Sequence, residues 1–138
     1  DVVTPQAEGV EVPGILTGMP VPRLRGYPVY TVVAEKLEAM VQLGMTNSRM
    51  KDFYDVDFLM TRFELDERML REAVRRTFAR RGTALPTGEL EFLKEEFREQ
   101  KHGLWQQFLQ RSALQASGSE FEKVLERLRD RLLPVLLD

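Results

Sequence analysis

The sequence predicts a mainly α-helical protein, a bundle of five or six helices that follows an extended arm with room for short strands. Residues 1–30 hold five of the seven prolines and four of the nine glycines, and both residue types disfavour helix. From Thr31 onward, apolar residues recur at helical spacing as far as the C-terminus. We therefore divide the chain into an arm at 1–30 and a helical domain at 31–138.

The first two predicted helices are joined by a short turn. The first is expected from Thr31 to Leu43, with Gly44 as its left-handed stop. The second begins near Arg49. Its core positions are expected to be Phe53, Phe58 and Leu59. Because short turns favour antiparallel neighbours, Lys36 of the first helix should lie near the start of the second.

The third helix has the clearest boundaries. Asp66 is a typical N-cap residue, and Leu65 and Leu70 occupy the two positions of a hydrophobic staple around it. Gly82 is expected to end this helix.

The last part of the chain predicts two or three further helices. A helix is expected at 88–102, and Gly103 marks a break or kink before "LWQQFLQRSAL", which leaves one helix or two as alternatives. The final helix is predicted from a capping box of Ser119 with Glu122, and it should run until Pro134.

Composition excludes several classes of site. With 20 basic and 22 acidic residues, the net charge of -2 creates no global field that attracts nucleic acid, so any such binding must come from a local patch. The absence of cysteine excludes disulfides and zinc-thiolate sites, and it fits a cytoplasmic location. No apolar run is long enough for a membrane span, and we expect no metal site within these residues.

The densest polar cluster lies in "AEKLEAMVQLGMTNSRMKDFYDVDFLM". Asp52 and Asp55 are three residues apart and so share one face of the second helix, beside the expected position of Lys36. A lysine ammonium suits a triphosphate, and a nearby carboxylate can orient it or hold a phosphate-bound magnesium. The alternative interpretation is a solvated helix surface, because Lys51 and Asp55 form an ordinary i,i+4 pair.

The segment "YPVYTVVAEKLEAMVQLGMTNSRMKDFYDVDFL" resembles the stretch that follows the catalytic core in the AbiEii/AbiGii toxin family, in which an AEKL helix precedes an NSRMKD-F-YD helix. The resemblance continues through "TFARRGTALP" to the region of Trp105, and so covers most of the chain from about Tyr27. It implies that the chain is the C-terminal helical portion of an abortive-infection, toxin-antitoxin nucleotidyltransferase. The arm at 1–30 would then connect to an upstream nucleotidyltransferase domain, or be a remnant of it.

The resemblance also implies roles for individual residues. The lysine of the AEKL motif matches Lys36, and the aspartates of the KD-F-YD motif match Asp52 and Asp55, of which we favour Asp55. These three are the expected catalytic residues, and Arg49 and Lys51 are assigned with Lys36 to nucleotide binding. The intact parent would use Mg²⁺ and a nucleoside triphosphate, with GTP as a candidate.

The chain departs from the family in one respect. In the family, a Gly-Ser turn followed by an Asp-x-Asp pair binds nucleotide and metal, and these 138 residues contain no such arrangement. Without metal-bridging carboxylates the charge of nucleotidyl transfer cannot be neutralised, so we expect this portion alone to be inactive and to hold no cofactor. The missing catalytic half would precede Asp1.

A second hypothesis is a helical module that binds RNA or a partner protein. Arg68, Arg71 and Arg75 form a stripe on the third helix, and arginine suits a phosphate backbone such as that of tRNA. Nearby glutamates favour the alternative of a solvated helix surface. An antitoxin is the expected protein partner. Unpaired strand edges in the arm at 1–30 would also favour a homodimer by exchange.

Overall fold

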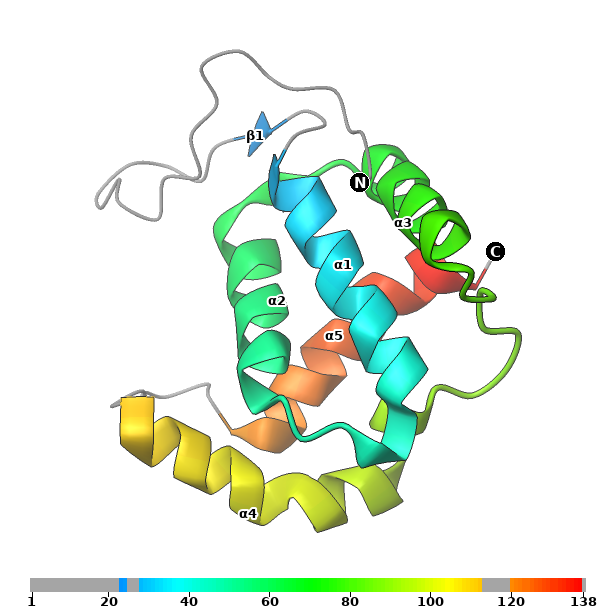
Figure 1. Cartoon of the computed structure of the whole chain (residues 1–138). Helices are drawn as coiled ribbons and strands as arrows, with labels where there is room; N and C mark the ends of the chain where they lie inside the picture. The colour runs from blue at the N-terminus through cyan, green and yellow to red at the C-terminus, as the bar shows by residue number, and fades with distance from the viewer. Residues whose placement is uncertain (1–22, 25–27, 113–119, 138) are drawn as a thin grey trace.

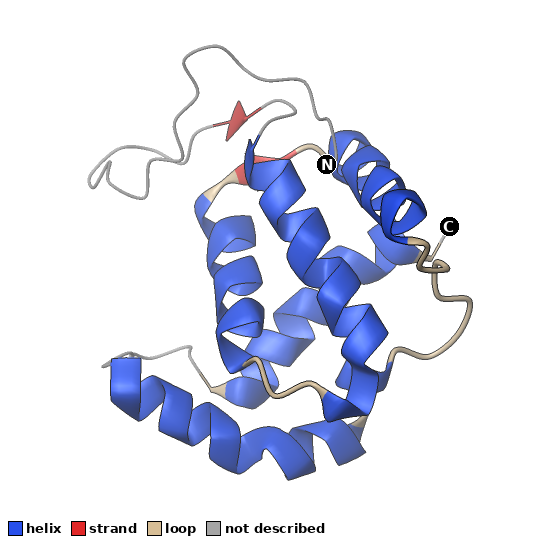
Figure 2. Ribbon diagram, viewed as in Figure 1, coloured by secondary structure: helices blue, strands red, loops and turns tan. Residues whose placement is uncertain are grey.

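The computed structural model describes residues 23–24, 28–112 and 120–137. Within these residues the chain forms five α-helices, two 3-10 turns and a pair of two-residue strands (Figures 1 and 2). The helices are α1 (Pro28–Leu43), α2 (Met50–Arg62), α3 (Glu67–Arg81), α4 (Glu95–Ser112) and α5 (Phe121–Leu136). The predicted mainly α-helical class is confirmed.

The first helix begins earlier than its sequence pattern indicated. We expected α1 to start at Thr31, whereas it starts at Pro28, so the last residues of the predicted arm are helical. Proline fits the first position of a helix, because its fixed φ is helical and its missing N–H would have no partner there. The helix ends at Leu43, and Gly44 follows with a φ of 53°, the left-handed stop that was predicted.

The boundaries of α3 follow the local sequence signals. The Asp66 side chain accepts a hydrogen bond from the backbone N–H of Met69 at 3.0 Å, which makes it the N-cap. At the other end, Gly82 adopts a left-handed conformation with a φ of 68°. Both predicted ends are confirmed.

Helix α4 differs from its prediction at two glycines. The segment after Gly88 leads into a 3-10 turn, η2 (Glu91–Leu93), and the α-helix starts only at Glu95. It then continues through Gly103 without a break, so of the two alternatives the structure has one helix. A glycine costs an exposed helix about 1 kcal/mol. Three buried side chains of the same helix outweigh that cost, namely Phe97, Trp105 and Leu109.

The last helix is longer than predicted. It starts at Phe121 with Glu120 as its N-cap residue, while Ser119 of the predicted capping box lies outside the described residues. It also continues past Pro134 to Leu136. Proline removes one backbone hydrogen bond there, but the residues around it are anchored because Leu132, Val135 and Leu136 are buried.

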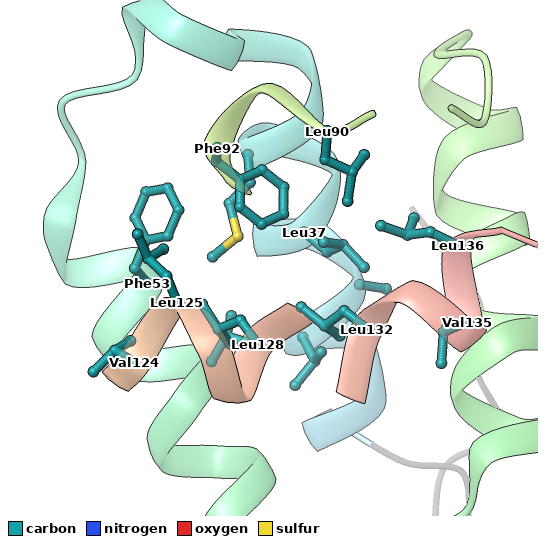
Figure 3. Close-up of a cluster of buried hydrophobic side chains, with 14 of the residues drawn as sticks. Leu37, Phe53, Leu90, Phe92, Val124, Leu125, Leu128, Leu132, Val135 and Leu136 are labelled. Atoms are coloured by element: carbon teal, nitrogen blue, oxygen red, sulfur yellow. The ribbon is translucent and has the colours of Figure 1, made fainter. Parts of the chain in front are cut away.

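The core lies where the helices cross. In Figure 1, α1 runs between α2 and α3, α5 crosses behind all three, and α4 lies across one end. Helix α1 packs most extensively on α3 and also on α2, and α5 packs on both α2 and α3. Figure 3 shows side chains of α1, α2, η2 and α5 meeting in one cluster. Residues of α1 such as Val33, Ala34 and Leu37 have no exposed surface.

Aromatic rings join α4 and α5 to the start of α2. The Phe53 ring lies 5.7 Å from Phe92 and 5.6 Å from Phe97, and Trp105 stacks on Phe121 at 4.9 Å between centroids. Phe53 is therefore a core residue, as predicted. The same prediction for Phe58 was wrong, because Phe58 is 45% exposed.

Two short strands mark the edge of the described structure near the arm. β1 (Arg23–Leu24) pairs in parallel with β2 (Glu64–Leu65), with Leu24 opposite Leu65. Most of the arm predicted at 1–30 lies outside the described residues. Both its assignment as a separate segment and its exchange in a homodimer therefore stay predictions.

The two phenylalanines of α2 differ enough in burial to test the assignment of the core. Phe53→Ala should lower the free energy of unfolding by about 3–5 kcal/mol, because it removes a fully buried ring and leaves a cavity. Phe58→Ala, on the same helix, should cost about 1 kcal/mol or less. Urea unfolding followed by circular dichroism measures both values. Equal losses for the two variants would contradict this packing of α2.

Candidate functional site

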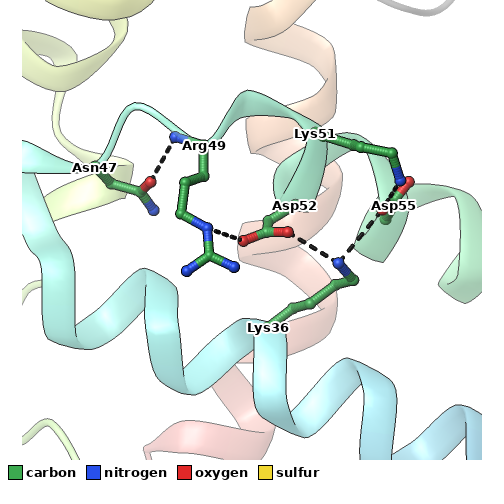
Figure 4. Close-up of polar contacts among 6 residues, drawn as sticks. All are labelled: Lys36, Asn47, Arg49, Lys51, Asp52 and Asp55. Atoms are coloured by element: carbon green, nitrogen blue, oxygen red, sulfur yellow. Dashed lines mark hydrogen bonds and ion pairs between the residues drawn. The ribbon is translucent and has the colours of Figure 1, made fainter.

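The lysine of α1 meets the aspartates of α2. Lys36 Nζ lies 2.8 Å from Asp52 Oδ1, to which it donates a hydrogen bond, and 3.4 Å from Asp55 Oδ2 (Figure 4). The two aspartates are one turn apart on the first half of α2, so both carboxylates face the same side. The predicted juxtaposition of Lys36 with the start of the second helix is confirmed.

Two more cations complete this arrangement. Arg49 Nε lies 3.0 Å from Asp52 Oδ2, and Lys51 Nζ lies 2.7 Å from Asp55 Oδ2. We call the five residues the Lys36 cluster, which consists of Lys36, Arg49, Lys51, Asp52 and Asp55. The cluster contains three cations and two carboxylates, so its formal charge is positive.

The turn between the helices is held by its own hydrogen bonds. In η1 (Gly44–Thr46), the Thr46 hydroxyl donates to the Leu43 carbonyl at 2.7 Å. The buried Asn47 side chain then accepts from the backbone N–H of Arg49 at 2.8 Å (Figure 4). These contacts fix the register between α1 and α2, and so place Lys36 opposite Asp52.

The Lys36 cluster is partly open to water. The side chains of Lys36 and Asp55 are 24% and 22% exposed, whereas that of Asp52 is 7% exposed. Burial alone lowers the pKa of Lys36, but the hydrogen bond to Asp52 and the charges of Asp52 and Asp55 outweigh it, so the pKa lies above its ordinary value. Lys36 is therefore a charged ammonium group at neutral pH that a ligand can reach.

One oxygen of Asp52 is held by charge alone. Asp52 Oδ2 is buried and makes no hydrogen bond within the described part of the chain, although Arg49 Nε is 3.0 Å away. The short distance and the missing hydrogen bond are compatible, because a hydrogen bond also needs the N–H to point at its acceptor. Asp52 is thus bound firmly to Lys36 and more loosely to Arg49.

A pocket adjoins the Lys36 cluster on the side of α4. It has a volume of about 370 Å³ and lies between residues 48–52 at the start of α2 and the second half of α4. Helix α4 contributes Leu104, Phe108 and Arg111. We call this cavity the α2–α4 pocket. Asp52 belongs both to its wall and to the Lys36 cluster.

The neighbouring Asp57 has a different role. Although it is two residues from Asp55, Arg127 of α5 binds it with both Nε and Nη2, at 2.9 and 2.8 Å. The hydrogen bond to Asp57 raises the pKa of Arg127. This two-point ion pair ties α5 to α2, so Asp57 is a structural residue and does not extend the Lys36 cluster.

The predicted arginine stripe lies on one surface of α3, but one of its members makes contacts within the fold. Arg68, Arg71 and Arg75 line a surface pocket of about 500 Å³ on α3. Arg71 Nη2 donates to the Pro134 carbonyl at 2.7 Å and to Glu67 at 3.1 Å. Arg71 therefore links α3 to the end of α5, which leaves it less available for a ligand than the exposed Arg68.

The described ranges contain neither a metal-binding group nor a membrane-spanning helix. No three of the histidine and acidic side chains there are grouped so that they could hold a metal ion. None of the described helices has both the length and the apolar composition needed to cross a membrane.

Comparison with known proteins identifies the family. The sequence model of the family described as "Nucleotidyl transferase AbiEii toxin, Type IV TA system" matches residues 1–127. The chain belongs to the AbiEii toxin family. No curated protein and no solved structure matches it significantly. The AbiEii description supports a toxin of the nucleotidyltransferase type, and its type IV toxin-antitoxin system implies an antitoxin as the counterpart.

Sequence patterns located only part of the site in this AbiEii chain. They predicted the Lys36 cluster, whose role in nucleotide binding stays a prediction, but they selected neither Phe108 nor Arg111 for a site. Phe108 is half-buried and lines the α2–α4 pocket. The spacing of Leu104, Phe108 and Arg111, four and then three residues apart, was a signal that they share one helix face.

The contact between Lys36 and Asp52 can be measured by a double-mutant cycle. Combining Lys36→Met with Asp52→Asn should give a coupling energy of about 1–3 kcal/mol, because Asp52 is buried and Lys36 is only partly exposed. The more exposed pair of Lys51 and Asp55 is a matched control, for which about 0.5 kcal/mol or less is expected. Unfolding by urea supplies both values. Equal coupling energies in the two pairs would contradict the conclusion that the contact between Lys36 and Asp52 is the stronger one.

Proposed function

We propose that the Lys36 cluster binds the triphosphate of a nucleoside triphosphate during nucleotidyl transfer. The observation that carries this proposal is the charged, water-accessible Lys36 ammonium held between Asp52 and Asp55. On this proposal the chain is the C-terminal helical portion of a toxin whose catalytic sheet lies upstream. That sheet would contain the Gly-Ser turn and Asp-x-Asp pair that the family resemblance implies, so the helical portion alone would be inactive.

The two aspartates would have different tasks. Asp52 is nearly buried and hydrogen-bonded to Lys36 at 2.8 Å, so it orients the ammonium group and stays bound to it. Asp55 is more exposed and 3.4 Å away, so a phosphate oxygen can replace it as the partner of Lys36 at less cost. We therefore assign Asp52 to positioning. Asp55 would exchange partners when the nucleotide binds, while Arg49 and Lys51 supply further positive charge.

The described residues do not fit a Mg²⁺ site by themselves. Asp52 and Asp55 both contact cationic side chains, and no third acidic or histidine side chain joins them within the described part of the chain. We therefore assign the metal to the upstream nucleotidyltransferase sheet. GTP remains our candidate nucleotide, with RNA or a protein as the acceptor.

The proposal predicts a loss of nucleotide affinity in the intact protein. Lys36→Ala should weaken triphosphate binding by about 10- to 100-fold, because a charge-assisted hydrogen bond contributes about 1.5–3 kcal/mol. Asp55→Ala should have a smaller effect on binding and lower the rate of transfer. Isothermal titration and a transfer assay with labelled nucleotide measure the two quantities. Lys123→Ala, an exposed lysine of α5, is the control and should change neither.

One outcome would remove the basis of the proposal. If Lys36→Ala and Asp55→Ala both fold normally and retain binding and transfer, the Lys36 cluster is a solvated ion-pair network. Circular dichroism of each variant establishes that it is folded.

The arginine surface of α3 favours a second candidate function, a module that binds RNA. Arg68 is exposed beside Arg71 and Arg75, and together they line a broad surface pocket. This surface would follow a phosphate backbone, with tRNA as the candidate ligand. A protein partner such as the antitoxin is the alternative occupant.

The second candidate predicts binding that depends steeply on salt. Filter binding of tRNA should weaken as salt rises, because each neutralised phosphate releases counterions. Arg68→Gln should lower the slope of log affinity against log salt by about one. A weak signal that does not change with salt would contradict RNA binding by this surface.

A further inference from the structure

The α2–α4 pocket combines an apolar floor with a cationic rim. Its apolar lining consists of Met50, Leu104 and Phe108, and its polar rim includes Arg49, Lys51 and Arg111. The volume of about 370 Å³ lies within the range of small-molecule sites. A ligand that matches both surfaces has a flat apolar part and several negative charges.

The ring of Phe108 is fixed by its neighbours. Its centroid lies 5.5 Å from that of Trp105 and 5.7 Å from that of Tyr54. Trp105 is fully buried, so the ring is supported from the core while Phe108 itself is half-buried and borders the pocket. A supported aromatic ring at a pocket wall can stack on a planar group without losing much side-chain freedom.

Positive charge predominates on the pocket rim. Arg49 and Lys51 contact aspartates of the Lys36 cluster, whereas Arg111 makes no ion pair with any side chain in the described ranges. Arg111 lies three residues after Phe108, and both line the pocket from the same face of α4. Because Arg111 is also exposed, its guanidinium is available to a ligand.

We propose that the α2–α4 pocket is the subsite for the base of the nucleotide whose triphosphate binds the Lys36 cluster. This inference rests on the proposed function and names Phe108 and Arg111 as residues that contact the base. Asp52 joins the two subsites, since it lines the pocket and holds Lys36. The base stacks on Phe108, and the phosphates extend past Arg49 and Lys51 to Lys36.

A comparison of two kinds of ligand tests the base subsite in the intact protein. The ligands are the four ribonucleoside triphosphates, each measured separately, and inorganic tripolyphosphate, which has no base. Phe108→Leu should raise the Kd of the best-bound nucleotide by about tenfold, because stacking on an aromatic ring is lost. The same variant should leave the Kd of tripolyphosphate unchanged. Phe108→Tyr keeps an aromatic ring and should retain nucleotide affinity.

A second variant avoids any change to the aromatic contacts. Arg111→Gln should also weaken nucleotide binding more than tripolyphosphate binding, because the proposal places Arg111 against the base and the phosphates along Arg49, Lys51 and Lys36. Arg111 is exposed, so its loss should leave folding unchanged. Arg129→Gln is the matched control, since this exposed arginine of α5 pairs locally with Asp130 at 3.2 Å. It should change neither affinity.

The outcomes separate this inference from the proposed function. Suppose that Lys36→Ala weakens the binding of both nucleotide and tripolyphosphate, while Phe108→Leu and Arg111→Gln change neither affinity. The pocket then does not hold the base, and the proposed function stands. If the two pocket variants weaken nucleotide binding and tripolyphosphate binding equally, the base subsite is likewise overturned. If Lys36→Ala changes neither affinity and the two pocket variants still weaken only nucleotide binding, the role of Lys36 is overturned and the base subsite stands.

Discussion

The burial of α1 between α2 and α3 is the constraint on which the candidate site depends. Val33, Ala34 and Leu37 have no exposed surface, so α1 cannot rotate or slide without opening the core. Lys36 stands between these buried positions and emerges where α1 faces α2. The geometry of the Lys36 cluster is therefore set by apolar packing, and the ion pairs form between groups that the core has already brought together.

The sequence predicted most of the fold where local chemistry decides the structure. Helical periodicity located the helices, and Asp66 and Gly82 marked the ends of α3 through effects that act within one turn. Where distant contacts decide, the sequence left alternatives open or gave a wrong prediction. Gly103 lies in an unbroken helix because Phe97, Trp105 and Leu109 of that helix are buried, and Phe58 is exposed although its spacing resembles that of a core residue. Neither result can be deduced from the residues nearby.

In the candidate site too, the part that depends on a short turn could be predicted, and the part that depends on distant packing could not. Lys36 and Asp52 are 16 residues apart, and a short turn between two helices was enough to predict their contact. The α2–α4 pocket instead needs Phe108 and Arg111, which reach α2 only through the packing of α4. No local pattern specifies that approach. A single sequence could therefore indicate the proposed phosphate-binding residues but not the pocket beside them.

The turn at Gly44 has a consequence for how the length of this chain can vary. Gly44 is buried with a φ of 53°, a conformation that residues with a Cβ rarely adopt, so this tight turn depends on glycine. Each residue added to a helix rotates the remainder of that helix by about 100°. One residue inserted at the start of α2 would turn its carboxylates away from the lysine and, by the same rotation, turn the buried Phe53 away from the core. The longer connection at 82–90 can absorb such an insertion, so natural length variation should collect there.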